Sequence, residues 1–284
     1  MRQAIILSLL IVCGAGIAIA WEMHVRTTKQ AYNAQAFKHE FVVMQAHHLM
    51  GFNLVDPEQA PHEIRESVMR GYHTMLNTAY FAPDYSHNQL SCSSCHFAGG
   101  DTLGGKNGGI SLVGVTKVYP QYSARAKKVI SLYQRIDNCF KRSMNGKSAP
   151  EKSQVMQDIL NYLHWISKEV AHLDQIPWLG LPEIKNSHVP SPEEGKKIYM
   201  DKCAACHLEN GEGSGKLHPI EGKTIPPLWG DHCYNDGAGM SMMRMLAPFI
   251  YLNMPYQQAH LTEEQSLDVA SYVLQQRRPV FIVD

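Results

Sequence analysis

Apolar residues recur at helical spacing in several segments of the chain. Near the N-terminus the pattern covers residues 28–50 and 61–80, and it returns over 121–142 and 150–172. Pro150 suits the first position of the last of these helices. The apolar face of that helix consists of Ile159, Leu160, Leu163, Ile166 and Val170. The pattern therefore predicts an all-α fold.

A proline-rich segment divides this pattern into two parts. Three prolines and a glycine lie between residues 174 and 190, and we expect this segment to be a linker. It separates an N-terminal domain over 21–173, which begins with a helical extension, from a C-terminal domain over 191–284.

Two helices of the C-terminal part are predicted by the residues that begin them. Ser191 followed by Glu194, and Thr262 followed by Gln265, both fit the capping box found at helix N-termini. The second helix is expected to bury the apolar residues Leu267, Val269, Ala270, Val273 and Leu274.

Each part of the chain contains one Cys-x-x-Cys-His motif, CSSCH at 92–96 and CAACH at 203–207. This spacing is the attachment signal for haem c, because the two thiols add to one porphyrin and the histidine becomes the proximal iron ligand. A single CxxC would also fit zinc or redox chemistry, but the adjacent histidine, present twice, disfavours both. The residues that would hold the two covalent haems are Cys92, Cys95, His96, Cys203, Cys206 and His207.

The surroundings of the two motifs follow a common order. Each motif is preceded by a predicted helix and followed by an irregular segment, at 99–114 and at 208–238, before further helices. The fold class we predict is therefore all-α, with two cytochrome c-like haem domains in tandem and an N-terminal helical extension.

Composition narrows the classes of partner. The 284 residues include 44% hydrophobic residues, and the formal net charge is zero, so no overall field favours nucleic acid or an anionic membrane. Of seven cysteines, four belong to the motifs. The remaining Cys13, Cys139 and Cys233 are an odd number, which disfavours a disulfide framework.

The N-terminus has the features of an export signal. Arg2 supplies a positive charge, an apolar run follows, and Ala18-Ile19-Ala20 forms a small-x-small cleavage site before Trp21. Residues 1–20 are thus a signal peptide, with an uncleaved membrane anchor as the alternative. In both cases the folded part faces the periplasm, where haem is attached.

In the second domain, Met254 is the candidate for the distal iron ligand. It lies in the segment Leu252-Asn253-Met254-Pro255, and a thioether ligand stabilises ferrous iron. Lys216 and Lys223 are further candidates. Four nearby methionines fit packing better than ligation: Met240, Met242, Met243 and Met245.

In the first domain two residues compete for the distal position, Met144 and Cys139. With Met144 on the iron, Cys139 would be a small buried residue. Between residues 121 and 147 there are seven basic residues and one acid, Asp137. Positive charges favour the thiolate, the form of cysteine that binds metal and attacks sulfur, and they also attract small dianions. The basic residues are Arg125, Lys127, Lys128, Arg135, Lys141, Arg142 and Lys147.

At these residues the chain resembles the bacterial thiosulfate dehydrogenase family, dihaem cytochromes that interconvert thiosulfate and tetrathionate. The resemblance covers roughly residues 73 to 280. Its most specific segment is RIDNCFKRSMNG at 135–146, accompanied by NGGISLVGV at 107–115 and YNDGAGM at 234–240. The motifs CSSCH and YPQY (119–122) also belong to it.

The resemblance implies roles for several residues. Cys139 would be the distal ligand of the first haem and the catalytic sulfur. Arg125 and Arg135 would bind the sulfur oxyanion, with Arg142 and Ser143 in the same pocket. Met254 would be the distal ligand of the second haem. Where some relatives have a lysine before this methionine, the chain has Asn253, which favours a stable His207/Met254 pair.

The function implied is that of a periplasmic oxidoreductase acting on sulfur compounds. Its partners would be thiosulfate, tetrathionate and a periplasmic electron carrier such as a small cytochrome c. Nucleic acid is not expected as a partner, and a membrane only through an uncleaved N-terminal anchor. The main alternative is a dihaem cytochrome that only transfers electrons. Two further alternative functions are a cytochrome of the sulfur-oxidising complex and a dihaem peroxidase.

Overall fold

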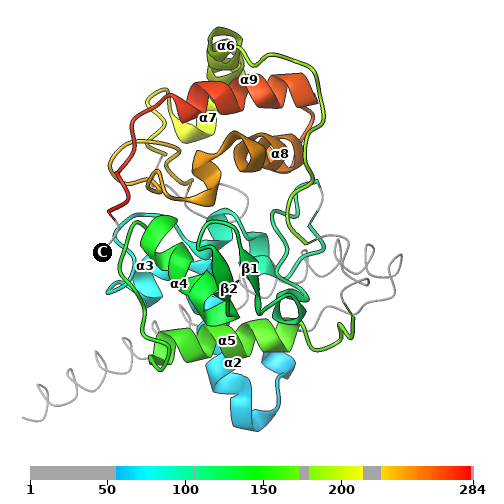
Figure 1. The fold of residues 1–284 in the computed structure, drawn as a ribbon, viewed down its shortest axis with the longest axis vertical. Helices are drawn as coiled ribbons and strands as arrows, with labels where there is room; N and C mark the ends of the chain where they lie inside the picture. The colour runs from blue at the N-terminus through cyan, green and yellow to red at the C-terminus, as the bar shows by residue number, and fades with distance from the viewer. Residues whose placement is uncertain (1–55, 105, 173–178, 214–224, 283–284) are drawn as a thin grey trace, which may run out of the picture. The chain divides into compact units, whose positions relative to one another are not determined.

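The computed structural model describes residues 56–104, 106–172, 179–213 and 225–282 (Figure 1). The helix predicted over 28–50 and the export signal lie outside these residues, as do Lys216 and Lys223. The described chain is mostly helical, and no helix in it is long and apolar enough to cross a membrane.

In the N-terminal part, the long helices are α2 (His62–Leu76), α4 (Leu132–Arg142) and α5 (Gln154–Ile166), with the short α3 (Thr78–Phe81) after α2. The 3₁₀ turns η1 (Pro57–Gln59), η2 (Cys92–Ser94), η3 (Phe97–Gly100) and η4 (Val115–Lys117) connect them. The predicted helix 61–80 is therefore correct in place, although it breaks at Asn77, whose φ is −141°.

The helix predicted over 121–142 is wrong in its first half. Strands β1 (Gln121–Ser123) and β2 (Lys128–Ile130) form an antiparallel hairpin, in which Tyr122 lies opposite Val129. The helix α4 begins only after Ser131, whose side chain and that of Gln134 form a capping box. The aromatic and β-branched residues suit a strand pair, and the capping box marks the helix start that periodicity alone missed.

The helix predicted over 150–172 is shorter than expected. Ser153 is its N-cap and accepts a hydrogen bond from the Met156 backbone, so Pro150 lies outside the helix. The helix ends at Ile166, and Val170 is buried beyond it. Of the predicted apolar face, Ile159, Leu163 and Ile166 are buried.

In the C-terminal part, the helices are α6 (Pro192–Lys202), α7 (Ala204–His207), α8 (Met243–Asn253) and α9 (Glu263–Leu274), with the turn η6 (Gly239–Ser241) before α8. The capping box of α9 is present. At α6 only half of the box forms, because the Ser191 backbone N–H donates to Asp268 and not to Glu194. Helix α8 was not predicted.

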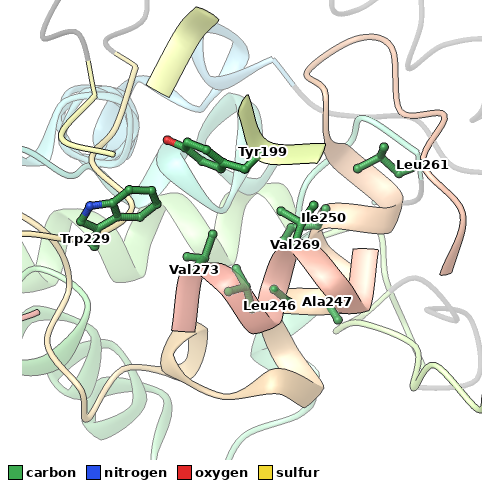
Figure 2. Packing of buried hydrophobic residues seen from close by; sticks show 9 residues of the cluster. Tyr199, Trp229, Leu246, Ala247, Ile250, Leu261, Val269 and Val273 are labelled. Atoms are coloured by element: carbon green, nitrogen blue, oxygen red, sulfur yellow. The ribbon is translucent and has the colours of Figure 1, made fainter. Parts of the chain in front are cut away.

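The core of the C-terminal part lies where α6, α8 and α9 meet (Figure 2). Val269, Ala270 and Val273 of α9 are at its centre, as the apolar pattern predicted, while Leu267 and Leu274 are partly buried. Tyr199 of α6 is fully buried, and its ring centroid is 5.1 Å from that of Trp229.

The same helix crossing occurs in both parts of the chain. A Cβ on Gly71 of α2 would lie 2.1 Å from the Asp158 carbonyl oxygen of α5, and one on Gly195 of α6 would lie 2.0 Å from that of Asp268 on α9. In each pair a glycine allows two helix backbones to touch at an aspartate. The structure thus repeats one helix crossing in the two parts of the chain, with a glycine on one helix and an aspartate on the other.

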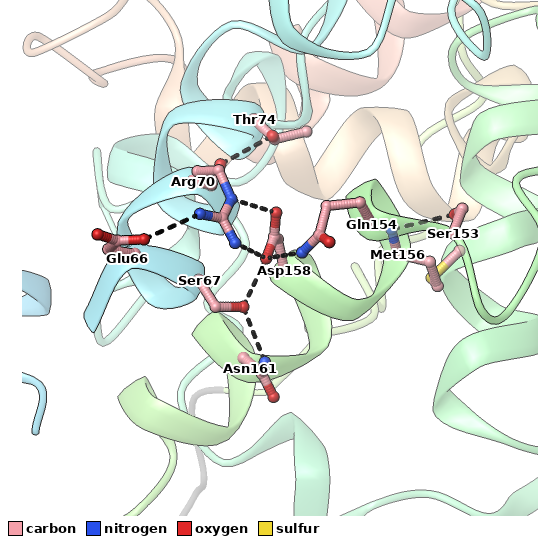
Figure 3. A network of polar contacts seen from close by, with 9 residues as sticks. All are labelled: Glu66, Ser67, Arg70, Thr74, Ser153, Gln154, Met156, Asp158 and Asn161. Atoms are coloured by element: carbon pink, nitrogen blue, oxygen red, sulfur yellow. Dashed lines mark hydrogen bonds and ion pairs between the residues drawn. The ribbon is translucent and has the colours of Figure 1, made fainter. Parts of the chain in front are cut away.

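Each aspartate at the crossing also accepts several hydrogen bonds. Asp158 accepts from Ser67, from Arg70 (Nε, 2.8 Å) and from Gln154 (2.9 Å), which links α2 to α5 (Figure 3). Asp268 accepts from His188 and from the backbone of Ser191, both at 2.7 Å. Ser67 and Arg70 reach Asp158 from the opposing helix and Gln154 from its own helix, so these buried carboxylates are satisfied, as buried charges must be.

Three buried asparagines connect the two parts. Asn88 donates to the carbonyl oxygens of Ser143 and Cys233, and Asn235 donates to that of Lys141. Asn253 is fully buried and accepts a 2.8 Å hydrogen bond from the Gly109 backbone. The neighbouring Leu252 carbonyl accepts from the Asn107 backbone at 2.7 Å, so the end of α8 is joined to the loop after the first motif.

Gly195→Ala should lower the stability of the protein, because the added methyl group meets the Asp268 backbone and the two helices must separate. We expect a loss of about 1–3 kcal/mol in the free energy of unfolding, the usual cost of overpacking. Thermal unfolding followed by circular dichroism measures it. Lys196→Ala, an exposed change on the same helix, is the matched control and should stay near the original midpoint.

Asn253→Ala should also destabilise the protein, since it leaves the buried Gly109 N–H without an acceptor. The expected cost is about 1–3 kcal/mol, the penalty of a buried unsatisfied donor. The exposed Asn210→Ala provides the comparison in the same thermal melts. Equal midpoints for both variants would show that the Asn253 contact does not stabilise the fold.

Candidate functional site

The first Cys-x-x-Cys-His motif forms a tight turn with an oriented histidine. Cys92 begins the turn η2 and Cys95 is its C-cap, and the His96 backbone donates to the Cys92 carbonyl. The His96 Nδ1 lies 2.8 Å from the Ile110 carbonyl oxygen. A carbonyl can only accept, so Nδ1 carries the proton and Nε2 keeps its lone pair for a metal. Burial lowers the His96 pKa to about 4, which keeps the ring neutral.

The second motif repeats this arrangement at the end of α6 and in α7. His207 is buried, and its Nδ1 lies 3.0 Å from the Pro226 carbonyl oxygen. Burial lowers the His207 pKa as well. Each motif thus has a neutral imidazole whose orientation is fixed by a carbonyl from the loop that follows.

The cysteines of the motifs fit attachment of haem better than binding of a bare metal ion. Burial raises the pKa of Cys92, Cys95 and Cys203 to about 12, so these groups remain thiols. In the part of the chain that the structure describes, no group of three or more His, Cys, Asp or Glu side chains could hold a metal ion, whereas haem attachment needs only two thiols and one histidine. The paired thiols and oriented histidines therefore fit one haem c at each motif.

Cys139 lies on α4 and faces the first motif. Arg135, one helical turn earlier, places its Nη1 2.8 Å from the Cys139 sulfur. The charge of a Cys139 thiolate is the main cause that raises the Arg135 pKa, and it also adds to the raised pKa values of Cys92 and Cys95, which burial dominates. Cys139 and Arg135 thus lie close to the first attachment site.

Asp137, the one acidic residue between residues 121 and 147, does not weaken the positive charge around Cys139. The Asp137 carboxylate is buried and forms a 2.8 Å ion pair with Lys141. It also accepts from the Ser148 hydroxyl at 2.7 Å and from the Ala149 backbone at 3.0 Å. Asp137 therefore stabilises the segment that follows α4, and its charge is already balanced there.

Arg125 and Arg142 are brought together by a carbonyl of the C-terminal part. Arg125, between β1 and β2, donates to the Gly237 oxygen, and so does Arg142 at 3.3 Å. Burial lowers the pKa of both groups, and the charges of neighbouring arginines lower them further. Three of the predicted arginines are thus within electrostatic range of one another, and one of them, Arg135, contacts the half-buried Cys139.

Met144 and Ser143, at the end of α4, take part mainly through their backbones. The Ser143 carbonyl accepts from Asn88 at 2.9 Å, and a bond from the Ser143 hydroxyl to the arginines is not among the hydrogen bonds of the described residues. Met144 is buried, with 4% of its surface exposed, and its carbonyl accepts from the His87 backbone at 3.1 Å.

Met254 is the C-cap residue of α8 and packs against the core of the C-terminal part. The buried Asn253 beside it holds this end of the helix through bonds to Gly109 and to the Phe249 carbonyl. Met240 and Met243 pack against the same core, in line with the expected packing role. Cys233 is fully buried, and burial raises its pKa to about 12.

Sequence reasoning missed the C-terminal contribution to the arginine cluster. Met242 accepts from Arg125 and from Arg244, each at 3.5 Å, and Gly237 supplies the shared carbonyl. The segment YNDGAGM at 234–240 was the only signal of this contribution in the sequence.

Comparison with known proteins supports the two-haem arrangement. The SoxA/TsdA cytochrome c domain matches residues 78–171, and the cytochrome c family matches residues 192–277. The thiosulfate dehydrogenase of Allochromatium vinosum is 36% identical over 217 residues, which are 76% of this chain and 80% of that protein. That of Thiomonas intermedia is 37% identical over 75% of this chain and 66% of its own length.

A solved structure has the same fold. The thiosulfate dehydrogenase TsdBA from Marichromatium purpuratum, in its as-isolated form, aligns with a TM-score of 0.73 and 26% identity. The alignment covers 80% of this chain and 50% of that longer one. The protein therefore has two cytochrome c domains with two covalently bound haem c groups, and it belongs to the thiosulfate dehydrogenase family.

Proposed function

We propose that this protein interconverts thiosulfate and tetrathionate in the periplasm, joining two thiosulfate anions into one tetrathionate with release of two electrons. The observation that carries the proposal is the 2.8 Å contact between Arg135 and the Cys139 sulfur, next to the first haem attachment site. A cysteine held beside a cation can act as a sulfur nucleophile and can receive an anionic substrate in the same place.

The residues that would hold the first haem are Cys92, Cys95 and His96, with Cys139 on the distal side. Cys203, Cys206, His207 and Met254 would hold the second. When bound, each haem takes up one electron, so the pair can accept the two electrons of the reaction. Cys139 is favoured over Met144 as the distal residue because it is half-buried and paired with a cation, whereas Met144 is buried with 4% of its surface exposed.

In the first step, the Cys139 thiolate forms a bond to the outer sulfur of one thiosulfate. Two electrons are released, and the product is a cysteine S-thiosulfonate with one terminal sulfonate. Arg135 stabilises the thiolate beforehand, and its planar guanidinium can then hold the sulfonate oxygens through two parallel N–H bonds.

In the second step, the outer sulfur of another thiosulfate attacks the sulfur bound to Cys139. A new bond forms between the two substrate sulfurs, the bond to Cys139 breaks, and tetrathionate leaves while the thiolate returns. This step is thiol–disulfide exchange, which needs no further oxidant. Repulsion between the approaching dianion and the adduct must be offset by fixed cations, which Arg125 and Arg142 supply.

The N-terminal export signal supports a periplasmic location, in which a small cytochrome c would exchange electrons with the haems. The direction of net reaction then depends on that carrier. Anaerobic assay of the purified protein with thiosulfate and with tetrathionate, using artificial electron carriers, tests the function in both directions.

Cys139→Ala should abolish turnover, by about a thousandfold or more, because the nucleophile is lost. Both haems should remain attached, which the haem spectrum and the protein mass report. Cys233→Ala, which removes a buried cysteine outside the site, is the control and should keep its activity. Near-normal turnover in Cys139→Ala would leave only an electron-transfer function.

Arg135→Leu should lower kcat/KM for thiosulfate by about 10–100-fold, because one charge-assisted contact to the anion is lost. Arg135→Lys keeps the charge but not the planar fork, so we expect an intermediate value. Arg277→Leu removes an exposed arginine paired with Asp231 and should change neither KM nor kcat. Unaltered kinetics in Arg135→Leu would remove this residue from the pocket.

A further inference from the structure

Four guanidinium groups from both cytochrome domains form a cluster in which Arg125 interacts electrostatically with each of the other three. Arg125, Arg135 and Arg142 belong to the N-terminal domain, and Arg244 belongs to α8 of the C-terminal domain. The charge of Arg244 is the second cause, after burial, that lowers the Arg125 pKa. Arg244 is not among the residues that the family resemblance implied.

Arg125 and Arg244 approach the same atom. Both donate to the sulfur of Met242, each at 3.5 Å, so the two cations lie on one thioether that carries no charge to balance them. Both side chains are exposed and therefore accessible to a small ligand. Two like charges held in this way repel each other unless an anion lies between them.

The cluster is short of acceptors among the described residues. None of the four arginines forms an ion pair with a described carboxylate. The Arg142 Nε is buried and has no hydrogen-bond partner there, although the Arg142 guanidinium packs on the Phe281 ring at 4.1 Å. An unmet buried donor on a cation points toward an anionic ligand.

The position of Arg244 adds to the positive potential. It lies in the first turn of α8, which has no side-chain cap and no acidic residue in that turn. The N-terminal end of a helix carries a partial positive charge, so a cation there is unfavourable by itself. The arrangement becomes favourable when an anion is bound.

The proposed reaction needs two places for sulfonate groups. Arg135 lies beside Cys139 and can hold the sulfonate nearest to it, but tetrathionate has a second sulfonate at its other end. Arg125 and Arg142 are tied to Gly237, toward the C-terminal domain, and Arg244 extends the positive surface there.

We propose that Arg244, with Arg125 and Arg142, forms a second sulfonate subsite built across the two domains. It holds the far sulfonate of tetrathionate, and in thiosulfate oxidation it holds the second thiosulfate as that anion attacks the cysteine adduct. The assignment rests on the proposed function, and it makes Arg244 a residue that determines specificity for molecules with two sulfonates.

The first test is binding without chemistry. Ethanedisulfonate has two sulfonates joined by two methylene groups in place of the central sulfurs of tetrathionate, so it cannot react. Calorimetry of the full-length, haem-loaded protein should show that Arg244→Gln weakens ethanedisulfonate binding about tenfold, the effect of one charge-assisted contact. Methanesulfonate, with a single sulfonate, should bind equally well before and after the substitution.

Matched variants separate local from general effects. Arg244→Lys should recover part of the affinity for ethanedisulfonate. Arg277→Gln, an exposed change elsewhere in the same domain, should leave that affinity unchanged. Haem spectra and melting temperatures should stay the same in all three. Equal losses for both sulfonates, or a protein that binds ethanedisulfonate no better than methanesulfonate, would overturn the subsite.

The second test separates the two reaction steps. In Arg244→Gln the initial reduction of the haems by thiosulfate should keep its rate. Steady-state turnover should fall about tenfold, and the KM for tetrathionate should rise about tenfold. Equal slowing of both steps would contradict the assignment. A native protein inactive with both anions would instead refute the proposed function, whatever the binding data show.

Discussion

The contact between the Arg135 guanidinium and the Cys139 sulfur is the interaction on which the site depends. Residues four apart lie on one face of a helix, so α4 presents cation and sulfur together to the first haem motif. A sulfur nucleophile beside a fixed positive charge is well placed to meet an anionic substrate. Asp137, from the same helix, would cancel that charge if it faced the same way, but Lys141 and the segment after α4 bind its carboxylate.

Local chemistry in the sequence predicted the haem motifs, and comparison confirms two cytochrome c domains. It also predicted the capping box at Thr262 and the buried face of α9. It failed at 121–131, where a short hairpin carries residues that also fit a helix period, and at α8, whose internal Pro248 and run of methionines hide the pattern. At 121–131 the strand-forming residues and the Ser131 capping box are local signals that a helix period alone overlooks. At α8 the local sequence carries no such signal, and packing in the C-terminal core decides the helix.

The duplication of the two domains is visible in backbone packing more than in residue patterns. Gly71 and Gly195 each allow a helix to touch the carbonyl of an aspartate, and each aspartate is then held by a different set of donors. A lone glycine inside a helix normally reduces its stability. At a crossing this close any larger residue would separate the helices, so the cost to the helix is offset by the contact. Sequence reasoning had no means of pairing these positions.

The boundary between the two cytochrome c domains is held by buried polar side chains. Three buried asparagines cross it, and their bonds fix the Gly109 loop, the end of α4 and the end of α8 relative to one another. The carbonyl of Gly237 then reaches two arginines of the other domain. Tetrathionate is longer than thiosulfate and carries a sulfonate at each end, so a protein that binds it needs two positions for anionic groups. If the second sulfonate is held as proposed, the same carbonyl that ties Arg125 and Arg142 to the second domain also places them at the far end of the substrate.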